Sequence, residues 1–492
     1  MKQESPFAST GIPGLDQVLN GGFPRHHVYL IQGDPGVGKT TLSLQFLMEG
    51  ARLGEKGLYI TMSETRAELL AVARSHEWNL DSIEIYEQLV GEQELTTEDS
   101  SLFHAAEVEL GPAIDRMIAE VDRIKPDRVV IDSLSEIRLL AQSTLRYRKQ
   151  ILALKQFFAG RNITALFLDD RTSETNDMQL QSVPHGVIAM ERYTPNYGTA
   201  RRRLEVVKVR GLKFRAGYHD FNILTGGIVV YPRLIAAESP QRLSHTAISS
   251  GLGELDAILG GGLDRGTSTL IMGPAGSGKS ALASQYLVGA AARGEPASVF
   301  IFEETLTTLF RRSESIGLDL KPYVSSGLMN VHQIDPAELQ PGEFVQLVRD
   351  AVLERKIQLL VIDSLNGYLN AMPEEKYLLL HLHELLTFLG QHGVATIMTF
   401  AQHGLLGSHM AASIDISYLA DCVVVLRYYE AHGTVSKAIS VIKKRSGYHE
   451  ATIRTLQITS DGVLVGPALR QFRGVLQGTP VIEEVRSEGG VR

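Results

Sequence analysis

The sequence predicts an α/β protein built from two tandem copies of one domain, each a mostly parallel sheet covered by helices. The first observation is an internal repeat, because residues of the first half recur 240 positions later without a gap. The second is that apolar strands alternate with helical patterns within each copy, which favours a parallel sheet. The matched residues of the first copy are Gly11, Leu15, Asp16, Leu19, Gly21, Gly22, Gln45, Gly54, Glu55, Glu64 and Thr65.

Short apolar runs place the strands of each copy. In the first copy we expect strands at 28–31, 58–61, 128–131, 165–168 and 186–190, and their partners in the second copy are 269–272, 299–302, 359–362, 395–398 and 422–426. Past the gapless stretch the offset falls by nine, since Asp132 matches Asp363. The extra residues of the first copy fit the polar run 91–100, which is typical of a surface loop.

The repeat also sets the domain boundaries. We expect a first domain at 1–235, a polar linker at 236–246, a second domain at 247–477 and a flexible tail at 478–492.

Each copy contains one glycine-rich loop between a predicted strand and a predicted helix. Residues 33–40 and 273–280 both fit the pattern G-x-x-x-x-G-K-[ST], in which backbone N–H groups and the helix N-terminus surround phosphates. Lys39 and Lys279 would reach the β- and γ-phosphates of a nucleoside triphosphate. The expected nucleotide-binding residues are Gly33, Gly36, Val37, Gly38, Lys39, Thr40 and Thr41 in the first copy, and Gly273, Gly276, Ser277, Gly278, Lys279, Ser280 and Ala281 in the second.

A second set of polar residues follows two apolar strands. Asp132 and Asp363 end the strands at 128–131 and 359–362, where an acid is costly unless it serves a cation. With the hydroxyls of Thr40 and Ser280 they predict a Mg²⁺ site in each copy. Ser133 and Ser364 come next and would sense the γ-phosphate. The expected cofactors are therefore ATP and Mg²⁺.

Hydrolysis also needs a base for the attacking water. In the second copy the strand at 299–302 is followed by Glu303 and Glu304, and two adjacent carboxylates favour one of raised pKa. In the first copy this pair is Ser63 and Glu64, so one acid is missing. An alternative is that Glu64 and Glu304 merely cap the helices that follow.

A Lys-x-Arg pair ends a strand in each copy. Alternation along a strand places Lys208 and Arg210 on one face, and likewise Lys443 and Arg445. Such a pair could stabilise a neighbouring subunit's γ-phosphate as a finger. The alternative is a solvated basic strand end.

Composition limits the class of protein. The 492 residues include 44% hydrophobic and 21% charged residues, no apolar run reaches the roughly 20 residues of a membrane span, and the start of the chain lacks the apolar core of a signal peptide. The single cysteine, Cys422, fits a reducing compartment, so we expect a cytoplasmic protein without membrane partners. The net charge of −8 argues against nucleic acid as the partner.

Taken together, these motifs resemble the KaiC family, the circadian-clock ATPases. The resemblance rests on the tandem Gly-x-x-x-Leu-Asp openings, both phosphate loops, the Glu303-Glu304 pair, the Ile-Asp-Ser strand ends and Lys208 to Gly211. It implies two RecA-like domains, a homohexameric double ring with ATP at every subunit interface, slow hydrolysis in the first domain and serine/threonine autokinase activity in the second. It also implies that the Lys-x-Arg pairs act across the subunit boundary.

Two positions depart from the family pattern. One is Ser63, which puts hydrolysis by the first domain in doubt. The other lies upstream of Asp421, where the family's clock member has an adjacent Ser-Thr phosphoacceptor pair and this chain has Ser417 and Tyr418. Ser417 is therefore the candidate acceptor and Tyr418 a weaker one, and an ordinary turn hydroxyl is the alternative for Ser417.

The function that fits best is an oligomeric Mg²⁺-dependent ATPase and autokinase with a regulatory role. One alternative is a nucleic-acid-dependent ATPase of the RecA/DnaB kind, because related domains build helicases. The other is a nucleotide-gated scaffold without kinase activity, which Ser63 makes credible for the first domain.

Overall fold

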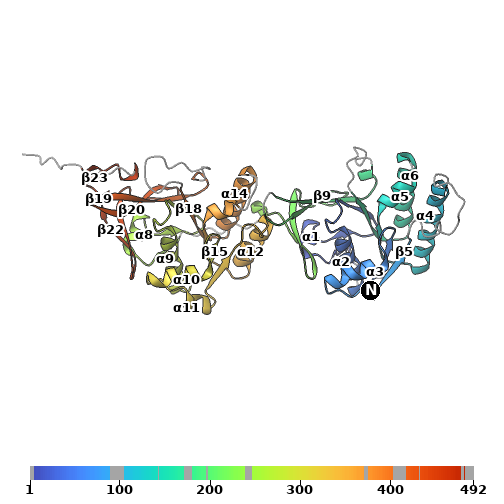
Figure 1. Ribbon diagram of the computed structural model, residues 1–492, viewed down its shortest axis with the longest axis horizontal. Coiled ribbons are helices and arrows are strands. Elements are labelled where there is room, and N and C mark those ends of the chain that lie inside the picture. The colour runs from blue at the N-terminus through green and yellow to red at the C-terminus, as the bar shows by residue number, and fades with distance from the viewer. Residues whose placement is uncertain are drawn as a thin grey trace, which may run out of the picture. The chain divides into compact units, whose positions relative to one another are not determined.

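A computed structural model describes residues 5–88, 105–141, 143–170, 180–195, 198–238, 246–370, 375–402, 417–431, 433–477 and 481–482. The chain divides into two compact units, Met1–Arg233 and Leu234–Arg492, each with a sheet of nine strands (Figure 1). The expected duplicated α/β architecture is therefore confirmed. Each unit is described by itself below.

The sheet of the first unit contains every strand that the sequence predicted for it. Its order is β11-β10-β9-β8-β3-β7-β6-β4-β5, with β8 to β5 parallel and β9 to β11 added as antiparallel strands. The strands are β3 Val28–Gly33, β4 Gly57–Thr61, β5 Ile83–Glu87, β6 Arg128–Asp132, β7 Thr164–Asp170, β8 Gly186–Tyr193, β9 Arg201–Val209, β10 Tyr218–Leu224 and β11 Gly227–Tyr231.

The sheet of the second unit repeats this order. It runs β16-β15-β17-β18-β14-β19-β20-β21-β22, again with a parallel part and three antiparallel strands at one end. The strands are β14 Ser268–Gly273, β15 Ala297–Ile301, β16 Met329–Gln333, β17 Leu359–Asp363, β18 Ala395–Ala401, β19 Cys422–Ala431, β20 Thr434–Lys444, β21 Arg454–Thr459 and β22 Gly462–Ala468.

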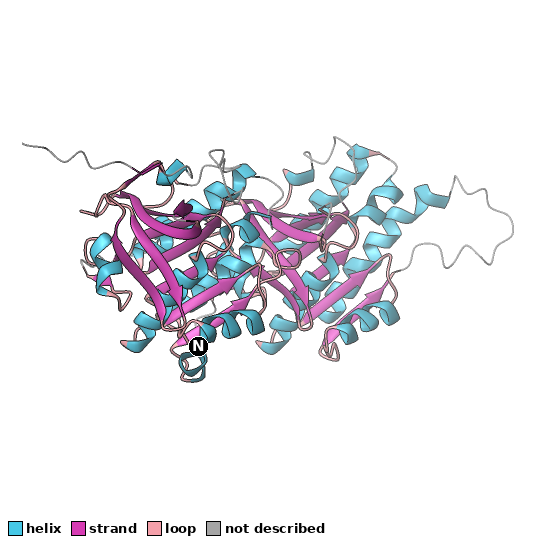
Figure 2. Ribbon diagram, turned by 60° about the vertical axis from the view of Figure 1, so that its left-hand side comes forward, coloured by secondary structure: helices cyan, strands magenta, loops and turns pink. Residues whose placement is uncertain are grey.

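Helices cover both faces of each sheet, so the strands lie between two apolar cores (Figure 2). In β3, Tyr29 and Ile31 face one core while Val28 and Leu30 face the other, as the two-residue period of a strand requires. In the first unit, α1 Pro13–Val18, α2 Lys39–Arg52 and α3 Arg66–Ser75 cover one face, and α4 Ala105–Ile124, α5 Leu134–Ala141 and α6 Thr144–Ala159 cover the other.

The second unit has the same two layers of helices. One face is covered by α8 Gly253–Ile258, α9 Lys279–Ala292, α10 Leu306–Ser315 and α11 Lys321–Ser325, and the other by α12 Pro341–Leu353, α13 Leu365–Asn370 and α14 Glu375–Gln391.

Strand direction gives each sheet two distinct edges. We call the edge where β3 and β14 end, at Gly33 and Gly273, the loop edge, and the opposite one the far edge. The parallel strands all end at the loop edge, whereas β9 and β20 are antiparallel to their neighbours and end at the far edge. Residues after β9 and β20 are therefore separated from the phosphate loop of their own unit by the length of the ladder.

Two segments differ from the expected domain boundaries. Ala236–Glu238, expected as linker, form a short 3₁₀ helix in the second unit, and the amide of Ala236 donates to Glu384 (3.1 Å). Val481–Ile482, expected in the flexible tail, form β24 and pair with β23 Phe472–Arg473. Backbone pairing with β23 thus extends regular structure into that tail. The predicted loop at 91–100 lies outside the described residues.

Candidate functional site

The two glycine-rich loops begin α2 and α9, as the motif predicts. Gly38 and Gly278 are the residues immediately before these helices, with φ of 114° and 109°, a left-handed conformation that side chains disfavour. Val37 and Ser277 are buried beneath the loops. Each loop therefore presents backbone N–H groups and the positive end of a helix at the loop edge.

The lysines of the two loops have different surroundings. Lys39 Nζ donates to the carbonyls of Gly33 (2.7 Å) and Asp34 (3.1 Å) and forms an ion pair with Asp170 (2.7 Å). Lys279 Nζ donates to the carbonyls of Gly273 (3.0 Å) and Pro274 (2.8 Å). Burial lowers the pKa of Lys279, although Asp363 and Glu303 act against this shift.

In the first unit the predicted metal ligands come together. Thr40 Oγ1 lies 3.3 Å from Asp132 Oδ2, and Tyr59 donates to the same oxygen (2.5 Å). Burial raises the pKa of Asp132, which the hydrogen bonds from Tyr59 and Thr40 and the charge of Lys39 partly offset. A hydroxyl and a carboxylate next to a phosphate loop are hard oxygen ligands, so they fit Mg²⁺ held jointly with phosphates.

In the second unit the corresponding residues line an open cleft of about 450 Å³. Asp363 accepts from Thr399 on β18 (2.5 Å), which takes the part that Tyr59 plays in the first unit. The cleft is lined by Gly276, Gly278, Lys279, Ser280, Ala281, Glu303, Glu304, Arg312, Ile316, Asp363, Ser364 and Ile458. Loop, metal ligands and candidate bases of the second unit thus share one cavity.

The glutamates that follow β4 and β15 also have different surroundings in the two units. Glu304 is held by Arg312 (2.6 Å), whereas Glu303 is exposed in the cleft. In the first unit Val72 stands where the repeat predicts an arginine, and Glu64 Oε2 is buried without a hydrogen-bond partner among the described residues. Burial, Asp132 and Glu68 raise the pKa of Glu64, while Lys39 lowers it.

The helix-capping alternative for these glutamates is not realised. Thr65 caps α3 by accepting from the amide of Glu68, and Thr305 caps α10 by accepting from the amide of Thr308. Glu64 and Glu304 each precede the capping threonine, so their carboxylates do not cap these helices.

The Lys-x-Arg pairs lie at the far edge. Lys443 Nζ donates to the carbonyls of Ser417 (2.9 Å) and Ala420 (2.7 Å), and Arg445 donates to the carbonyl of Tyr418 (3.0 Å). The pair thus lies on one side of its strand and surrounds the segment with the candidate phosphoacceptors. In the first unit Arg210 donates in the same manner to the carbonyl of Ser182 (2.7 Å), and burial, Arg210 and Lys155 lower the pKa of Lys208.

Ser417 and Tyr418 belong to a turn just before β19, and Tyr418 is exposed. Cys422 at the start of β19 pairs with Thr269, four residues before the phosphate loop, which amounts to about 13 Å of ladder. The turn therefore lies at the far edge of the sheet, whereas the cleft of its own unit lies at the loop edge.

Several residues of the site were missed in the sequence. Tyr59, Thr399 and Arg312 each contact a predicted acid, but they come from strands or helices that no short motif includes. Asp170 gave a usable signal, because Gly33 pairs with Asp170 where Gly273 pairs with Ala401. An acid beside a phosphate loop in one copy alone is visible once the strands are aligned.

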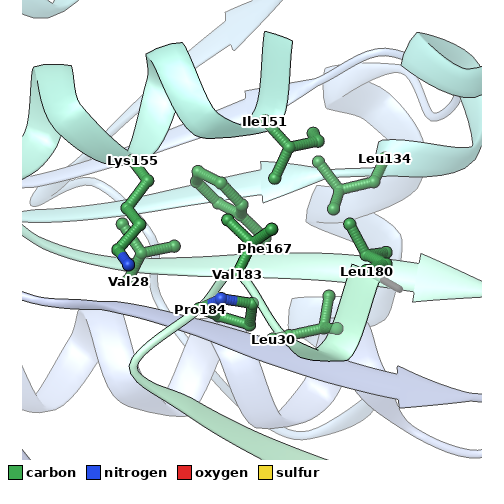
Figure 3. Close-up of a pocket in the computed structure, with 9 residues that line it drawn as sticks. All are labelled: Val28, Leu30, Leu134, Ile151, Lys155, Phe167, Leu180, Val183 and Pro184. Carbon is green, nitrogen blue, oxygen red and sulfur yellow. The ribbon is translucent and has the colours of Figure 1, made fainter. Parts of the chain in front are cut away.

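Two other hollows are less suited to a nucleotide. The apolar one between α6 and the sheet of the first unit leaves ≈ 0 Å³ for a water molecule (Figure 3). A groove of about 500 Å³ in the same unit is lined by Gly11, Gln45, Met48, Glu49, Ala51, Arg52, Trp78, Asn79, Ser82 and Gly226. Neither contains a residue of the phosphate loops.

Comparisons with known proteins agree with this geometry. The sequence profile described as KaiC ATPase matches residues 8–235 and 248–470. The chain is 29% identical over 476 residues to the circadian clock protein KaiC3 of Synechocystis sp., covering 96% of this chain and 94% of that protein. It is 28% identical over 480 residues to the circadian clock oscillator protein KaiC of Nostoc sp., covering 96% of this chain and 91% of that protein.

The described residues lack two further features. No helix in that part of the chain combines the length and apolarity needed to cross a bilayer. Nor do three or more His, Cys, Asp or Glu side chains gather there as a ready metal site.

Proposed function

Since this chain belongs to the KaiC family of ATPases, we propose that both phosphate loops bind Mg²⁺–ATP and that the second domain is also a serine/threonine autokinase. The observation that supports this most is the cleft of about 450 Å³ that joins Lys279, Ser280, Asp363 and Glu303. A nucleotide site of this kind needs all four groups within one cavity.

Cationic and oxygen-bearing residues of the cleft would have different roles. Lys279 and the backbone of the loop bind the phosphates, and Ser280 and Asp363 would hold the Mg²⁺ ion, which neutralises charge on the phosphate oxygens. Thr40 and Asp132 would do the same in the first domain. Ser133 and Ser364, which directly follow the two aspartates, would contact the γ-phosphate.

Hydrolysis requires a carboxylate that takes a proton from the attacking water. Glu303 is the base that we assign in the second domain, because Arg312 holds Glu304 in an ion pair. Glu64 is the base that we assign in the first domain, since its raised pKa increases its affinity for a proton. In both cases water oxygen bonds to the γ-phosphorus while the bond to the β-phosphate oxygen breaks and ADP leaves.

The fingers would act between subunits. Lys208 and Arg210, like Lys443 and Arg445, lie at the far edge of their sheets, so a second copy of the chain must bring them to a phosphate loop. A head-to-tail interface that repeats closes into a ring, and a homohexamer is the ring that the family resemblance implies.

Contacts at the far edge support a proposal for the phosphoacceptor. Lys443 and Arg445 both contact the turn at 417–420, so a loop edge that meets these fingers also meets Ser417. We assign Ser417 as the acceptor in the neighbouring subunit. Its Oγ would bond to the γ-phosphorus, its proton would pass to Glu303, and ADP would leave. The output would be regulatory, in the phosphorylation state of the ring.

The proposal is tested by incubating purified protein with Mg²⁺ and γ-labelled ATP. We expect both free phosphate and labelled protein, with the label mapped to Ser417 by mass spectrometry. Lys279→Ala should abolish the label, because it removes the phosphate contact in the second domain. Lys39→Ala is the matched control and should keep the label.

Two results would contradict parts of the proposal. Free phosphate without labelled protein would exclude the autokinase and leave an ATPase. Label that survives Ser417→Ala at full level would place the acceptor elsewhere, with Tyr418→Phe as the next variant.

A further inference from the structure

The two phosphate loops face different strand ends. Residue Asp170 ends β7 directly beside Gly33, and Ala401 ends β18 directly beside Gly273. One position earlier, Asp169 corresponds to Phe400. The duplicated frame therefore has a charged strand end in the first domain and an apolar one in the second.

Asp170 forms an ion pair with Lys39, the lysine that would bind the phosphates. A lysine ammonium has three donors, and Lys39 uses them on Gly33, Asp34 and Asp170 at 2.7, 3.1 and 2.7 Å. Lys279 makes only the two carbonyl contacts among the described residues. A phosphate can thus accept from Lys279 at once, but from Lys39 only after an existing partner gives way.

The position of Asp170 is fixed by its surroundings. Ser135 Oγ accepts from the amide of Asp170 (3.3 Å) and lies 3.4 Å from its carboxylate, while the buried Asp169 forms an ion pair with Arg138 (2.8 Å). In the second domain Asn366 takes the place of Ser135 and bonds only the backbone of Ala401, at 2.7 and 3.0 Å. The acid is therefore held at the loop rather than free to swing into solvent.

We propose that Asp170 lowers the affinity of the first phosphate loop for nucleotides by competing with their phosphates for Lys39. This inference rests on the proposed binding of nucleotide at residues 33–40. The carboxylate occupies a lysine donor and also places a negative charge beside the phosphates. The second domain has Ala401 at this strand end, and among the described residues no carboxylate accepts from Lys279 there, so the two loops of one chain fill at different nucleotide concentrations.

The local charge supports this direction. Burial raises the pKa of Glu136 and the charge of Asp170 adds to that rise, whereas on the pKa of Asp132 the charge of Asp170 acts in the same direction but is smaller than the effects of burial, Tyr59, Thr40 and Lys39. Its side chain is 37% exposed, which limits the interaction through solvent screening. A partly exposed charge contact is worth about a 2- to 5-fold change in affinity.

The test is a titration of the full chain with Mg²⁺–ADP by calorimetry in a Lys279→Ala background, where bound nucleotide reports the first loop. We expect Asp170→Asn and Asp170→Ala to tighten binding about 2- to 5-fold. Asparagine keeps the size and a carbonyl acceptor, so a gain shared by both variants is due to charge. Asp81→Asn, which removes an exposed acid at the far edge, should leave the affinity unchanged.

The reverse substitution uses the second loop. In a Lys39→Ala background, Ala401→Asp should weaken Mg²⁺–ADP binding by a similar factor. Unchanged or weaker binding in both Asp170 variants would overturn the inference while leaving the proposed function intact. A lack of binding in every Lys279→Ala protein, with normal binding in Lys39→Ala, would instead remove the first loop from the proposed function and the inference with it.

Discussion

In the site that we propose for the first domain, Glu64 would serve as the base although no second acid stands beside it. Its partner position holds Ser63, which is exposed and cannot serve as a carboxylate. The carboxylate of Glu64 is half-buried, and burial together with Asp132 raises its pKa. A base of raised pKa binds its proton more tightly, which favours proton removal from water near neutral pH.

This predicts a pH dependence for the first domain. Glu64 accepts a proton only when it is ionised, so turnover should fall as the pH drops through its raised pKa, at a higher pH than for an ordinary glutamate. Phosphate release by Lys279→Ala protein, measured from pH 5 to pH 8 or so, checks this. Glu64→Gln in that background should lose turnover by about 100-fold or more.

Glu68→Gln is the matched control for Glu64. Glu68 is exposed and its pKa is lowered by the amide and hydroxyl of Thr65, so its loss should weaken the cap of α3. Because the charge of Glu68 also raises the pKa of Glu64, Glu68→Gln should move the fall in turnover to lower pH while keeping turnover at pH 8 or so. If Glu64→Gln retained full phosphate release in the Lys279→Ala background, the base of the first domain would be another group.

At this scale the sequence predicted the residues of short motifs and missed their long-range partners. Lys39, Thr40 and Asp132 follow from local patterns. Tyr59 does not, because its hydroxyl meets Asp132 only when β4 and β6, 73 positions apart at these two residues, lie side by side. Such contacts depend on strand order, which a single motif does not encode.

At the scale of elements, Arg128 ties α2 to the sheet of the first unit. Its fully buried side chain donates to the carbonyls of Phe46 and Ser9 (2.7 Å each) and to Glu55 (2.5 Å). A Cβ on Gly50 would lie 2.6 Å from Arg128 Cδ, so helix and arginine fit only with glycine there. The second unit has Ala290 and Leu359 at these two positions.

We therefore expect Arg128→Leu to destabilise the first unit by about 3 kcal/mol, because it leaves buried polar groups without a partner. Gly50→Ala alone should also destabilise it. The double variant, which copies the second unit, should recover part of the loss since the methyl group fills the space. Urea unfolding followed by fluorescence of Trp78, the single tryptophan, reports this unit alone.

Additive losses in the double variant would contradict this account of helix packing.

The contact between Arg128 and Glu55 also makes stability depend on pH. Burial favours a raised pKa for Glu55, but Arg128 and Arg25 outweigh it and lower the pKa. The stabilisation is therefore present above the ordinary glutamate range and is lost as the pH falls through the lowered value.

Elements themselves were well predicted where an apolar run defined them. All ten predicted strands are present, although β15 ends at Ile301, one residue before the predicted end, and β7, β8, β18 and β19 extend further than the apolar residues. Strands lengthen because polar residues at their ends still pair with neighbours. The three antiparallel strands at the end of each sheet were only partly anticipated. Polar residues interrupt β10 and β21, whereas β11 and β22 contain short apolar runs that the prediction did not use.

For the whole molecule, the two copies share their strand order but differ in the acidic residues near the phosphate loops. Both sheets share strand order and a bulge at the start of β8 and β19, which sets Lys208 and Lys443 at equivalent points. The acids around the loops have diverged instead, with Asp170 against Ala401 and Ser63 against Glu303. In the ring that we propose, each site would be assembled from the loop edge of one subunit and the far edge of its neighbour.

If cleft and finger come from different subunits, as proposed, two inactive variants should complement each other. Lys279→Ala lacks the phosphate contact but keeps the far edge of the second domain, whereas Arg445→Ala lacks the finger but keeps the cleft. Each protein alone should fail to label Ser417. Subunits dissociated, mixed in equal amounts and reassembled would form productive contacts at about a quarter of interfaces, if mixing is random. The label should then appear on Ser417 of the Lys279→Ala subunit, which mass spectrometry of size-tagged subunits can identify. A mixture that remains unlabelled would mean that cleft and finger of one chain serve each other, which the opposite sheet edges make sterically difficult. Label on the Arg445→Ala subunit would instead mean that a cleft phosphorylates Ser417 of its own chain.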